Sequence, residues 1–166
     1  VIWTTTPWTI PANLGIALHP EFDYVAVDTG AGEALILARA LVEDCMKRFG
    51  IEDYKVIADI RPADLERKRC LHPLYDRESL VVLGLHVTLD AGTGCVHTAP
   101  GHGREDHEVG LKYGLDAYSP VDDRGCFTDE VDLFAGQFVF KANPGINQTL
   151  RANGALLAEV QIKHSY

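Results

Sequence analysis

The alternation and spacing of apolar residues predict a series of short strands with a few helices between them. Runs rich in β-branched and other apolar residues predict strands over residues 14–18, 23–28, 33–37, 54–60, 80–88, 94–98, 137–140 and 155–162. Apolar residues at helical spacing predict helices over residues 41–49, 105–113 and 145–153, with a brief helical turn at 62–66. Gly50 and Gly114 are typical residues to end the first two of these helices.

The order of these elements indicates a mixed α/β fold. Predicted strands outnumber helices, and they do not alternate with them in the strict strand–helix–strand order of a doubly wound sheet. We therefore expect a closed or strongly curved mixed sheet with a few peripheral helices, formed by residues 1–166 as a single domain.

Composition narrows the classes of protein that remain. The length of 166 residues and the apolar content of 46% fit one globular domain with a substantial core. The formal net charge of −9 argues against a surface that coats nucleic acid indiscriminately, because such a surface needs clustered Lys and Arg. A narrow basic path around a single acidic end remains compatible with this charge.

The cysteines and the chain ends indicate where the protein is located and whether the chain is part of a longer one. Cys45, Cys70, Cys95 and Cys126 lie far apart without a C-x-x-C pair, so we expect reduced thiols of a cytoplasmic protein, although four cysteines also permit two disulfides. No apolar run approaches the roughly 18 residues that span a bilayer, and no signal peptide is visible. The chain begins inside an apolar run without an initiator Met and stops at residues 164–166 without a cap, which indicates a piece cut from a longer protein.

The first candidate site is the threonine-rich stretch 4–9 (TTTPWT), which Asn13 follows. Because Thr has a high β propensity, the three threonines are also explained as strand-end residues. In the functional interpretation, Pro7 ends strand pairing and Pro11 bounds the turn, so that hydroxyls and backbone N–H groups converge and can hold a water or an oxyanion. Trp8 is expected to pack, with stacking on a flat ligand as the alternative.

The second candidate site is the glycine-rich stretch 93–106 (TGCVHTAPGHGRED), which Gly92 precedes. Its glycines, Gly94 among them, let the backbone take positive φ and approach a ligand closely. Asp106 falls in the first turn of the following predicted helix, where the helix dipole favours a carboxylate even without a ligand. The functional alternative is a charge-assisted hydrogen bond from a substrate ammonium group to Asp106.

Two other kinds of chemistry have to be weighed for the same stretch. His97, His102 and His107 recur every five residues, which suggests a zinc hydrolase, but the helical two-His zinc motif uses i, i+4 spacing. A Gly/Pro loop can still bring such histidines together. Cys95 lies beside His97 on one predicted strand, yet no nucleophile elbow surrounds this thiol. No Walker loop or dinucleotide fingerprint is present.

Several motifs together resemble a known family. They are residues 3–9 (WTTTPWT), 11–13 (PAN), 90–94 (DAGTG) and 97–103 (HTAPGHG). These motifs resemble the editing domain of the isoleucyl-tRNA synthetases, the insertion in a class I catalytic core known as connective polypeptide 1. The resemblance covers essentially the whole chain, to the closing His-Ser-Tyr. Valyl and leucyl synthetases share the threonine-rich peptide, the G-T-G-x-V strand and the Asp at the helix start. The H-T-A-P-G-H-G sequence of residues 97–103 favours the isoleucine enzymes.

The resemblance implies both a fold and a reaction. The fold is a β-barrel core with surrounding helices. The reaction is the hydrolysis of valine wrongly esterified to the isoleucine tRNA, with isoleucine excluded by its size. The H-I-G-H and K-M-S-K-S signatures of amino-acid activation are absent, so the fragment alone is not expected to charge tRNA. An editing domain of the valyl or leucyl type, or a binding module without catalysis, is the alternative.

The resemblance also implies roles for individual residues. His97 would be the wall that leaves no room for the extra carbon of isoleucine, and Asp106 would bind the α-ammonium group. Thr6, with Thr4 and Thr5, would hold the terminal adenosine and position the attacking water. The remaining substrate-binding positions would be Trp8, Thr9, Asn13 and Gly94.

Cofactors and partners follow from the same resemblance. No metal or other cofactor is expected, since ATP and zinc would belong to other parts of the parent enzyme. The expected partners are the 3′-aminoacylated end of tRNA(Ile), its valine moiety and the rest of the parent synthetase, in a cytoplasmic monomer without membrane contact. Because the chain is acidic, the body of the tRNA is expected to be held elsewhere in the parent protein.

Overall fold

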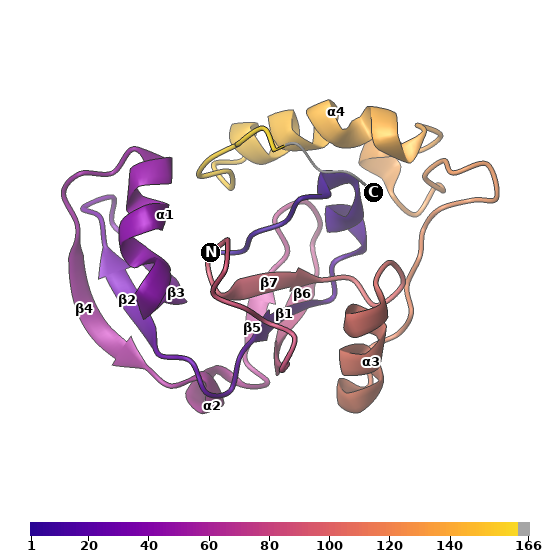
Figure 1. Cartoon of the computed structure of the whole chain (residues 1–166). Helices are drawn as coiled ribbons and strands as arrows, with labels where there is room; N and C mark the ends of the chain where they lie inside the picture. Colours follow the sequence, from indigo (N-terminus) through magenta and orange to yellow (C-terminus); the bar gives the residue numbers. More distant parts are fainter. Residues whose placement is uncertain (163–166) are drawn as a thin grey trace.

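The computed structural model describes residues 1–162 and divides their strands into two sheets (Figure 1). One sheet has the order β5–β6–β1–β7 and the other the order β3–β2–β4. The strands are β1 (Gly15–Leu18), β2 (Tyr24–Asp28), β3 (Ala34–Ala38), β4 (Lys55–Ile60), β5 (Arg69–Leu71), β6 (Glu78–Leu83) and β7 (Cys95–Thr98). The helices are α1 (Val42–Phe49), α2 (Pro62–Leu65), α3 (Arg104–Tyr113) and α4 (Val139–Ala152), with 3₁₀ helices η1 (Pro7–Ala12), η2 (Arg39–Leu41) and η3 (Asp132–Phe134).

Strand β1 is the centre of the four-stranded sheet. It pairs in parallel with β6 and antiparallel with β7, so that Ile16 lies opposite both Val81 and His97. The chain before η1 adds an isolated bridge between Trp3 and Val96. The amino-terminal threonine stretch therefore runs beside β7, although the two segments lie far apart in the sequence.

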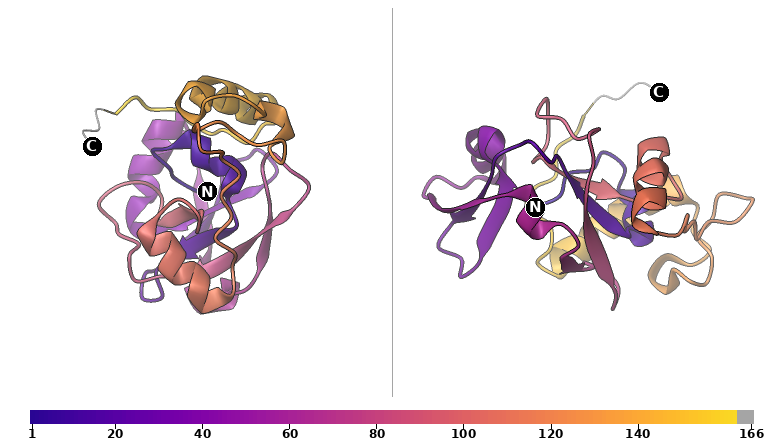
Figure 2. Two further views of the ribbon diagram at one scale, coloured as in Figure 1. Left: turned by 90° about the vertical axis from the view of Figure 1, so that its right-hand side faces the viewer. Right: turned by 90° about the horizontal axis from the view of Figure 1, so that it is seen from below.

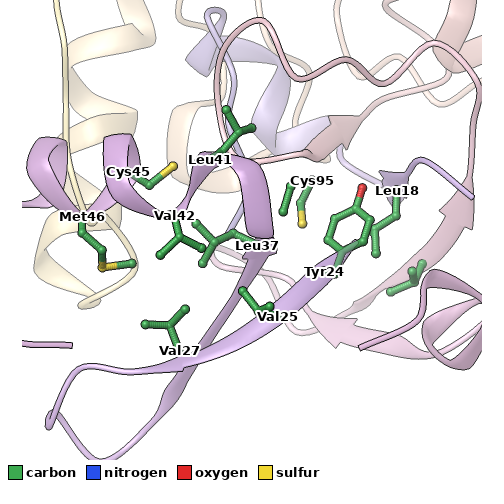
Figure 3. Close-up of a cluster of buried hydrophobic side chains, with 12 residues drawn as sticks. Leu18, Tyr24, Val25, Val27, Leu37, Leu41, Val42, Cys45, Met46 and Cys95 are labelled. Atoms are coloured by element: carbon green, nitrogen blue, oxygen red, sulfur yellow. The ribbon is translucent and has the colours of Figure 1, made fainter. Parts of the chain in front are cut away.

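The three-stranded sheet and helix α1 enclose the largest apolar cluster (Figure 3). Leu37 of β3 and Met46 of α1 are fully buried in it, as is Tyr24 of β2. The hydroxyl of Tyr24 donates to the carbonyl of Gly94, which ties this sheet to the start of β7. Helix α1 ends at Gly50, whose φ of 70° is left-handed, as the sequence predicts.

Helix α4 covers η1 and closes a second apolar cluster (Figure 1). Val139, Ala142, Ile146 and Leu150 recur at helical spacing and are buried. The backbone N–H of Trp8 in η1 donates to Oδ1 of Asn143 in α4 over 2.8 Å. Helix α3 lies at the opposite end of the molecule from β2, β3 and β4, as the further views confirm (Figure 2).

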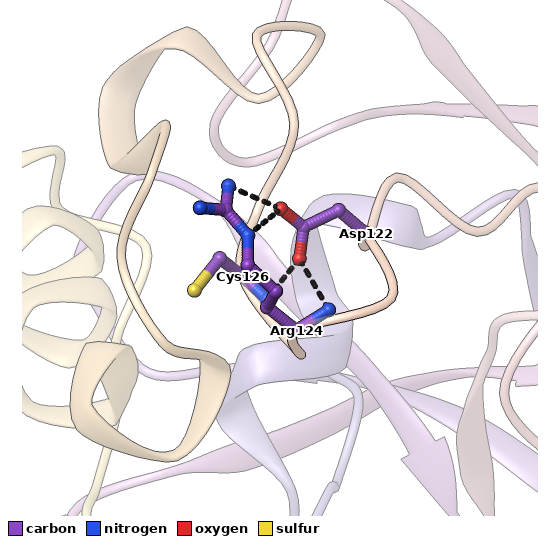
Figure 4. A network of polar contacts seen from close by, with 3 residues as sticks. All are labelled: Asp122, Arg124 and Cys126. Atoms are coloured by element: carbon purple, nitrogen blue, oxygen red, sulfur yellow. Dashed lines mark hydrogen bonds and ion pairs between the residues drawn. The ribbon is translucent and has the colours of Figure 1, made fainter.

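A turn-rich segment leads from α3 to α4, and one carboxylate orders its middle (Figure 4). Asp122 accepts hydrogen bonds from the backbone N–H groups of Arg124 and Cys126, both over 2.9 Å, and from the guanidinium group of Arg124. The N–H of Cys126, together with Arg124, lowers the pKa of the Asp122 carboxyl group. Besides this local capping, Phe127, Val131 and Phe134 of the same segment are buried in the second apolar cluster.

Most predicted elements are confirmed, but the barrel is not. Within residues 1–162 the strands form two open sheets, and no ladder closes either sheet on itself. Residues 137–140 are not a strand, because α4 begins there at Val139 and contains Pro144 inside it. Residues 155–162 form no strand either, and the predicted strand 80–88 stops at Leu83. The closing His-Ser-Tyr lies outside the described residues.

One further residue differs from expectation in its burial. The helical spacing of residues 105–113 makes Leu111 available for burial with Val109 and Tyr113, but Leu111 is 69% exposed while the other two are buried. It lies two positions from each of them, and on an α-helix that spacing points to a different face. Within the described residues, no helix is both long and apolar enough to cross a membrane.

Candidate active site

The two candidate stretches meet at one cavity of about 360 Å³. The cavity is lined by Thr4, Thr6, Trp8, Thr9, His97, Ala99, His102, Asp106 and Phe140. These residues come from the amino-terminal peptide and η1, from β7 and the loop after it, and from the first turns of α3 and α4. The β1–β7 pairing brings the first two groups together, and the packing of α4 on η1 adds the third.

His97 forms the buried side of this cavity. It lies on β7 and is 6% exposed. Its Nε2 lies 2.9 Å from Oγ1 of Thr9, and its Nδ1 lies 2.6 Å from Nδ2 of Asn13. Burial lowers the pKa of His97 to about 4, and the nearby His72 and His102 act in the same direction. His97 is therefore a neutral ring with both nitrogens engaged by protein groups, which makes it unsuited to be a general base.

Asp106 supplies the negative charge of the cavity. It is the third residue of α3, and its Oδ2 accepts a hydrogen bond from the backbone N–H of Ala99 over 2.9 Å. Burial raises the pKa of the Asp106 carboxyl group, while the Ala99 hydrogen bond and His86 lower it. Among residues 1–162, no Lys or Arg forms a salt bridge with Asp106. The carboxylate therefore faces the cavity without a cationic partner from the described chain, as a binding group for a cationic ligand would.

The threonine-rich peptide forms the opposite side. It is an irregular segment that turns into η1, with Pro7 at the first position of that helix. The backbone N–H of Thr6 donates to Oγ1 of Thr4 over 3.1 Å, and the N–H and hydroxyl of Thr9 both donate to the carbonyl of Thr6. These contacts hold the backbone at Thr6 from both sides, and the side chains of Thr4 and Thr6 line the cavity.

Three aromatic rings border the cavity. Trp8 makes edge contacts with His102, with ring centroids 5.0 Å apart, and with Phe140, 5.9 Å apart. Phe140 is 60% exposed although it is a large apolar side chain. The rim of the cavity therefore offers apolar aromatic surface next to the polar groups of its interior.

Three predicted site residues do not line this cavity. Thr5 borders a second cavity of about 600 Å³, which Thr4 also lines, and Asn13 borders that cavity while contacting His97. Gly94 lies in the interior between the two sheets, with a φ of 78°. A Cβ at Gly94 would come within 2.5 Å of the Ala38 Cβ, so this glycine makes room for the side chain of Ala38.

Sequence reasoning misses several residues of the site. Phe140 falls in a predicted strand, and no local signal links it to Trp8, since α4 brings it there. A second missed group is His72, whose Nε2 donates to the carbonyl of Ile10 over 3.0 Å and so supports η1 from the β5–β6 hairpin. Arg77 of the same hairpin donates to the carbonyls of Pro11 and Asn13. The amino-terminal site segment is thus held by residues about sixty positions later.

The alternative chemistries find little support in this geometry. Within residues 1–162, no group of three or more His, Cys, Asp or Glu side chains is placed to hold a metal ion. His97 is buried, whereas His107 is exposed on α3. Cys95 is buried in the apolar cluster, and burial raises the pKa of its thiol to about 11, which disfavours the nucleophilic thiolate.

Two of three comparisons with known proteins find similar proteins. No family model matches the chain. It is 58% identical over all 166 residues to the isoleucine–tRNA ligase of Geobacter sulfurreducens and 55% identical to that of Desulfovibrio desulfuricans. The chain spans about 18% of the length of these relatives. It also resembles the solved structure described as "The crystal structure of GlLeuRS-CP1", with a TM-score of 0.72 and 18% identity over 96% of this chain and 83% of that one.

The structural comparison and the sequence comparisons support different statements about the chain. The low identity to the solved structure supports a common fold alone. The high identity to the ligases extends along the entire chain, although it covers only one segment of each of those proteins. The chain is therefore similar along its whole length to one segment of isoleucine–tRNA ligases, and it shares the fold of the solved CP1 structure.

Proposed function

We propose that this chain is the proofreading unit of an isoleucine–tRNA ligase, and that it hydrolyses valine from wrongly charged tRNA(Ile). The observation that carries the proposal is the single cavity shared by Thr4, Thr6, His97 and Asp106. It combines a carboxylate without a salt bridge in the described chain, hydroxyl groups and a neutral buried ring. These are the groups needed to hold an α-ammonium, to orient an ester and to limit side-chain size.

The proposed reaction needs orientation more than a strong base. A water oxygen attacks the carbonyl carbon of the aminoacyl ester, the bond from that carbon to the ribose oxygen breaks, and the ribose oxygen leaves with a proton. Asp106 would pair with the α-ammonium group and thereby fix the ester. The hydroxyl of Thr6 would position the water or stabilise the developing oxyanion. Since aminoacyl esters are already reactive, we propose that no protein-bound metal takes part.

The proposed setting follows from the relatives. The substrate would be the 3′-aminoacylated end of tRNA(Ile), delivered by the rest of the parent enzyme in the cytoplasm. Residues 1–166 would act as one unit within that enzyme. The charge of −9 is consistent with a tRNA body held by other parts of the parent protein.

The size limit can be tested at His97. In the parent ligase carrying His97→Ala, we expect Ile-tRNA(Ile) to become a substrate for deacylation, with its rate rising by about tenfold or more because the wall retreats. Deacylation of radiolabelled Ile-tRNA(Ile) and Val-tRNA(Ile) measures this. His107→Ala is the matched control, since His107 is exposed on α3. Equal exclusion of isoleucine by the His97→Ala enzyme would show that another group sets the limit.

The catalytic role of the peptide can be tested at Thr6. We expect Thr6→Ala to lower kcat for Val-tRNA(Ile) deacylation by about a hundredfold, as for the loss of one oxyanion donor. The free energy of unfolding should change by less than about 1 kcal/mol, because the Thr6 hydroxyl has a long, exposed contact of 3.3 Å with its neighbour Thr5. Thr5→Ala is the comparison, with a smaller loss expected, since Thr5 borders the other cavity. Unfolding of Thr6→Ala would favour a structural role.

The same experiments separate the proposal from its alternatives. An editing unit of the valyl type would cleave threonyl esters in preference to valyl esters. A binding module would leave the ester intact in the parent enzyme while still binding it. The identities of 58% and 55% to isoleucine–tRNA ligases favour valine as the substrate.

A further inference from the structure

A row of hydrogen bonds runs from β6 to the threonine peptide, and its last three members line the 360 Å³ cavity. It joins Ser79, Asn13, His97, Thr9 and the carbonyl of Thr6. Ser79 is 2% exposed, Asn13 is 4% exposed, and neither lines the 360 Å³ cavity. Ser79 is not a candidate site residue by its sequence, and its hydroxyl contacts the side chain of Asn13 rather than the backbone.

The orientation of the Asn13 amide follows from its partners. Nδ2 of Asn13 lies 2.9 Å from the carbonyl oxygen of Gly15, which can only accept, so this atom is the NH₂ group. The Oδ1 of Asn13 faces Oγ of Ser79, whose hydroxyl donates to it. The second N–H of Asn13 is then left to donate to Nδ1 of His97 over 2.6 Å.

The tautomer of His97 follows in turn. Because Nδ1 accepts from Asn13, the proton of the neutral ring is on Nε2. Nε2 donates to Oγ1 of Thr9 over 2.9 Å, and the single proton of Thr9 goes to the carbonyl of Thr6, also over 2.9 Å. Each group in the row therefore has one direction of donation, from Ser79 toward Thr6.

We propose that Ser79 is a positioning residue for substrate selection: through Asn13 it holds His97 as the Nε2–H tautomer with its ring fixed, and so keeps the wall of the pocket closed to isoleucine. This proposal rests on the function proposed above. The effect depends on burial, because a buried polar network is rigid when every member has its partner and loosens when one is lost. Without the Ser79 hydroxyl, Oδ1 of Asn13 loses its donor, and the amide and the ring are freer to move.

The tautomer can be measured without any catalytic assay. Nitrogen-15 NMR of the chain labelled at histidine, at pH 7, should show His97 with Nε2 protonated and Nδ1 unprotonated, with the signal assigned by its loss in His97→Gln. In Asn13→Asp, where a carboxylate oxygen faces Nδ1, we expect a proton on Nδ1. A wild-type ring protonated on Nδ1 would overturn the inference even if the chain is an active deacylase.

Selection can be measured in the full-length ligase. For Ser79→Ala we expect the deacylation rate of Ile-tRNA(Ile) to rise about tenfold, with the rate for Val-tRNA(Ile) changed less than about threefold. Ser79→Thr, which keeps the hydroxyl, should restore exclusion of isoleucine. Thr98→Val is the matched control, since the buried Thr98 hydroxyl donates to the carbonyl of Val96 outside this row.

The outcomes distinguish this inference from the function on which it rests. If Ser79→Ala cleaves valyl-tRNA but still excludes isoleucine as the wild type does, Ser79 is not a positioning residue. If Ser79→Ala does not fold, Ser79→Cys, with its weaker donor, takes its place and should show a smaller rise with isoleucine. A wild-type ligase without valyl deacylation would remove the function, whereas the NMR result tests the hydrogen-bond row by itself.

Discussion

Replacing Asp106 with asparagine in the parent ligase is expected to lower kcat/KM for deacylation of Val-tRNA(Ile) by about a hundredfold. Truncating one partner of a buried charge pair costs about 2–5 kcal/mol, and about 1.4 kcal/mol corresponds to a factor of ten. The amide introduced by Asp106→Asn would keep an oxygen that accepts from the N–H of Ala99, so the loop after β7 should retain its shape. The loss would then reflect the missing charge opposite the α-ammonium group.

The control for this variant lies one residue away. Glu105 is an exposed acid in the same first turn of α3, and Glu105→Gln should leave deacylation within about twofold of the wild type. An ester without the α-amino group should be cleaved equally by the wild type and by Asp106→Asn. Undiminished deacylation of Val-tRNA(Ile) by Asp106→Asn would remove Asp106 from the mechanism.

Mild acid is expected to destabilise the chain through two buried histidines. Burial lowers the pKa of His72, with Arg77 adding to the effect, and it also lowers the pKa of His97; each falls from 6.5 to about 4. Between those values the unfolded chain binds more protons than the folded chain, so stability falls as the pH decreases from about 6.5 toward 4. Each ring should remove about 3 kcal/mol from the free energy of unfolding when the pH reaches 4.

Urea unfolding at a series of pH values between 7.5 and 4.5 measures this loss. His72→Gln should be less stable than the wild type at pH 7, because the contacts of the ring with the η1 carbonyl and two backbone N–H groups are disturbed. The free energy of unfolding of His72→Gln should also depend less steeply on pH, because about one proton fewer is taken up on unfolding. His107→Gln, at an exposed position, should keep the wild-type slope. If the free energy of unfolding of His72→Gln depended on pH as steeply as that of the wild type, His72 would not be a source of the acid sensitivity.

The spacing of apolar residues predicts the ranges of most strands and helices, but it does not predict how the strands assemble into sheets. β1, β2 and β4 lie within a residue of their predicted ranges because their apolar runs are bounded by turn signals. The strand predicted over residues 137–140 is wrong, since Phe138, Val139 and Phe140 are equally compatible with a strand and with the first turn of a helix. The helix forms because Val139 continues the buried spacing of Ala142 and Ile146, although Pro144 lies inside α4.

The sequence predicts the charged and hydroxyl-bearing residues of the candidate site. It does not predict the residues that hold them in place. The residues that carry charge or hydroxyl groups, such as Thr6 and Asp106, lie in conspicuous motifs and reach one cavity. Phe140, His72 and Ser79 lie in ordinary stretches, and only tertiary packing brings them to the site. Gly94 is the opposite case. Its motif suggests contact with a ligand, whereas in the structure the missing Cβ makes room for Ala38.

The central place of β1 has a consequence for how the chain folds during synthesis. Asn13 and His97 are separated by 84 residues, and β1 finds its second neighbour only when β7 has been made. At roughly 5–20 residues per second, translation takes roughly 4–17 s to cover that interval. Loop closure must precede the contacts that reward it, so the groups that would recognise a substrate can meet only after β7 has been synthesised.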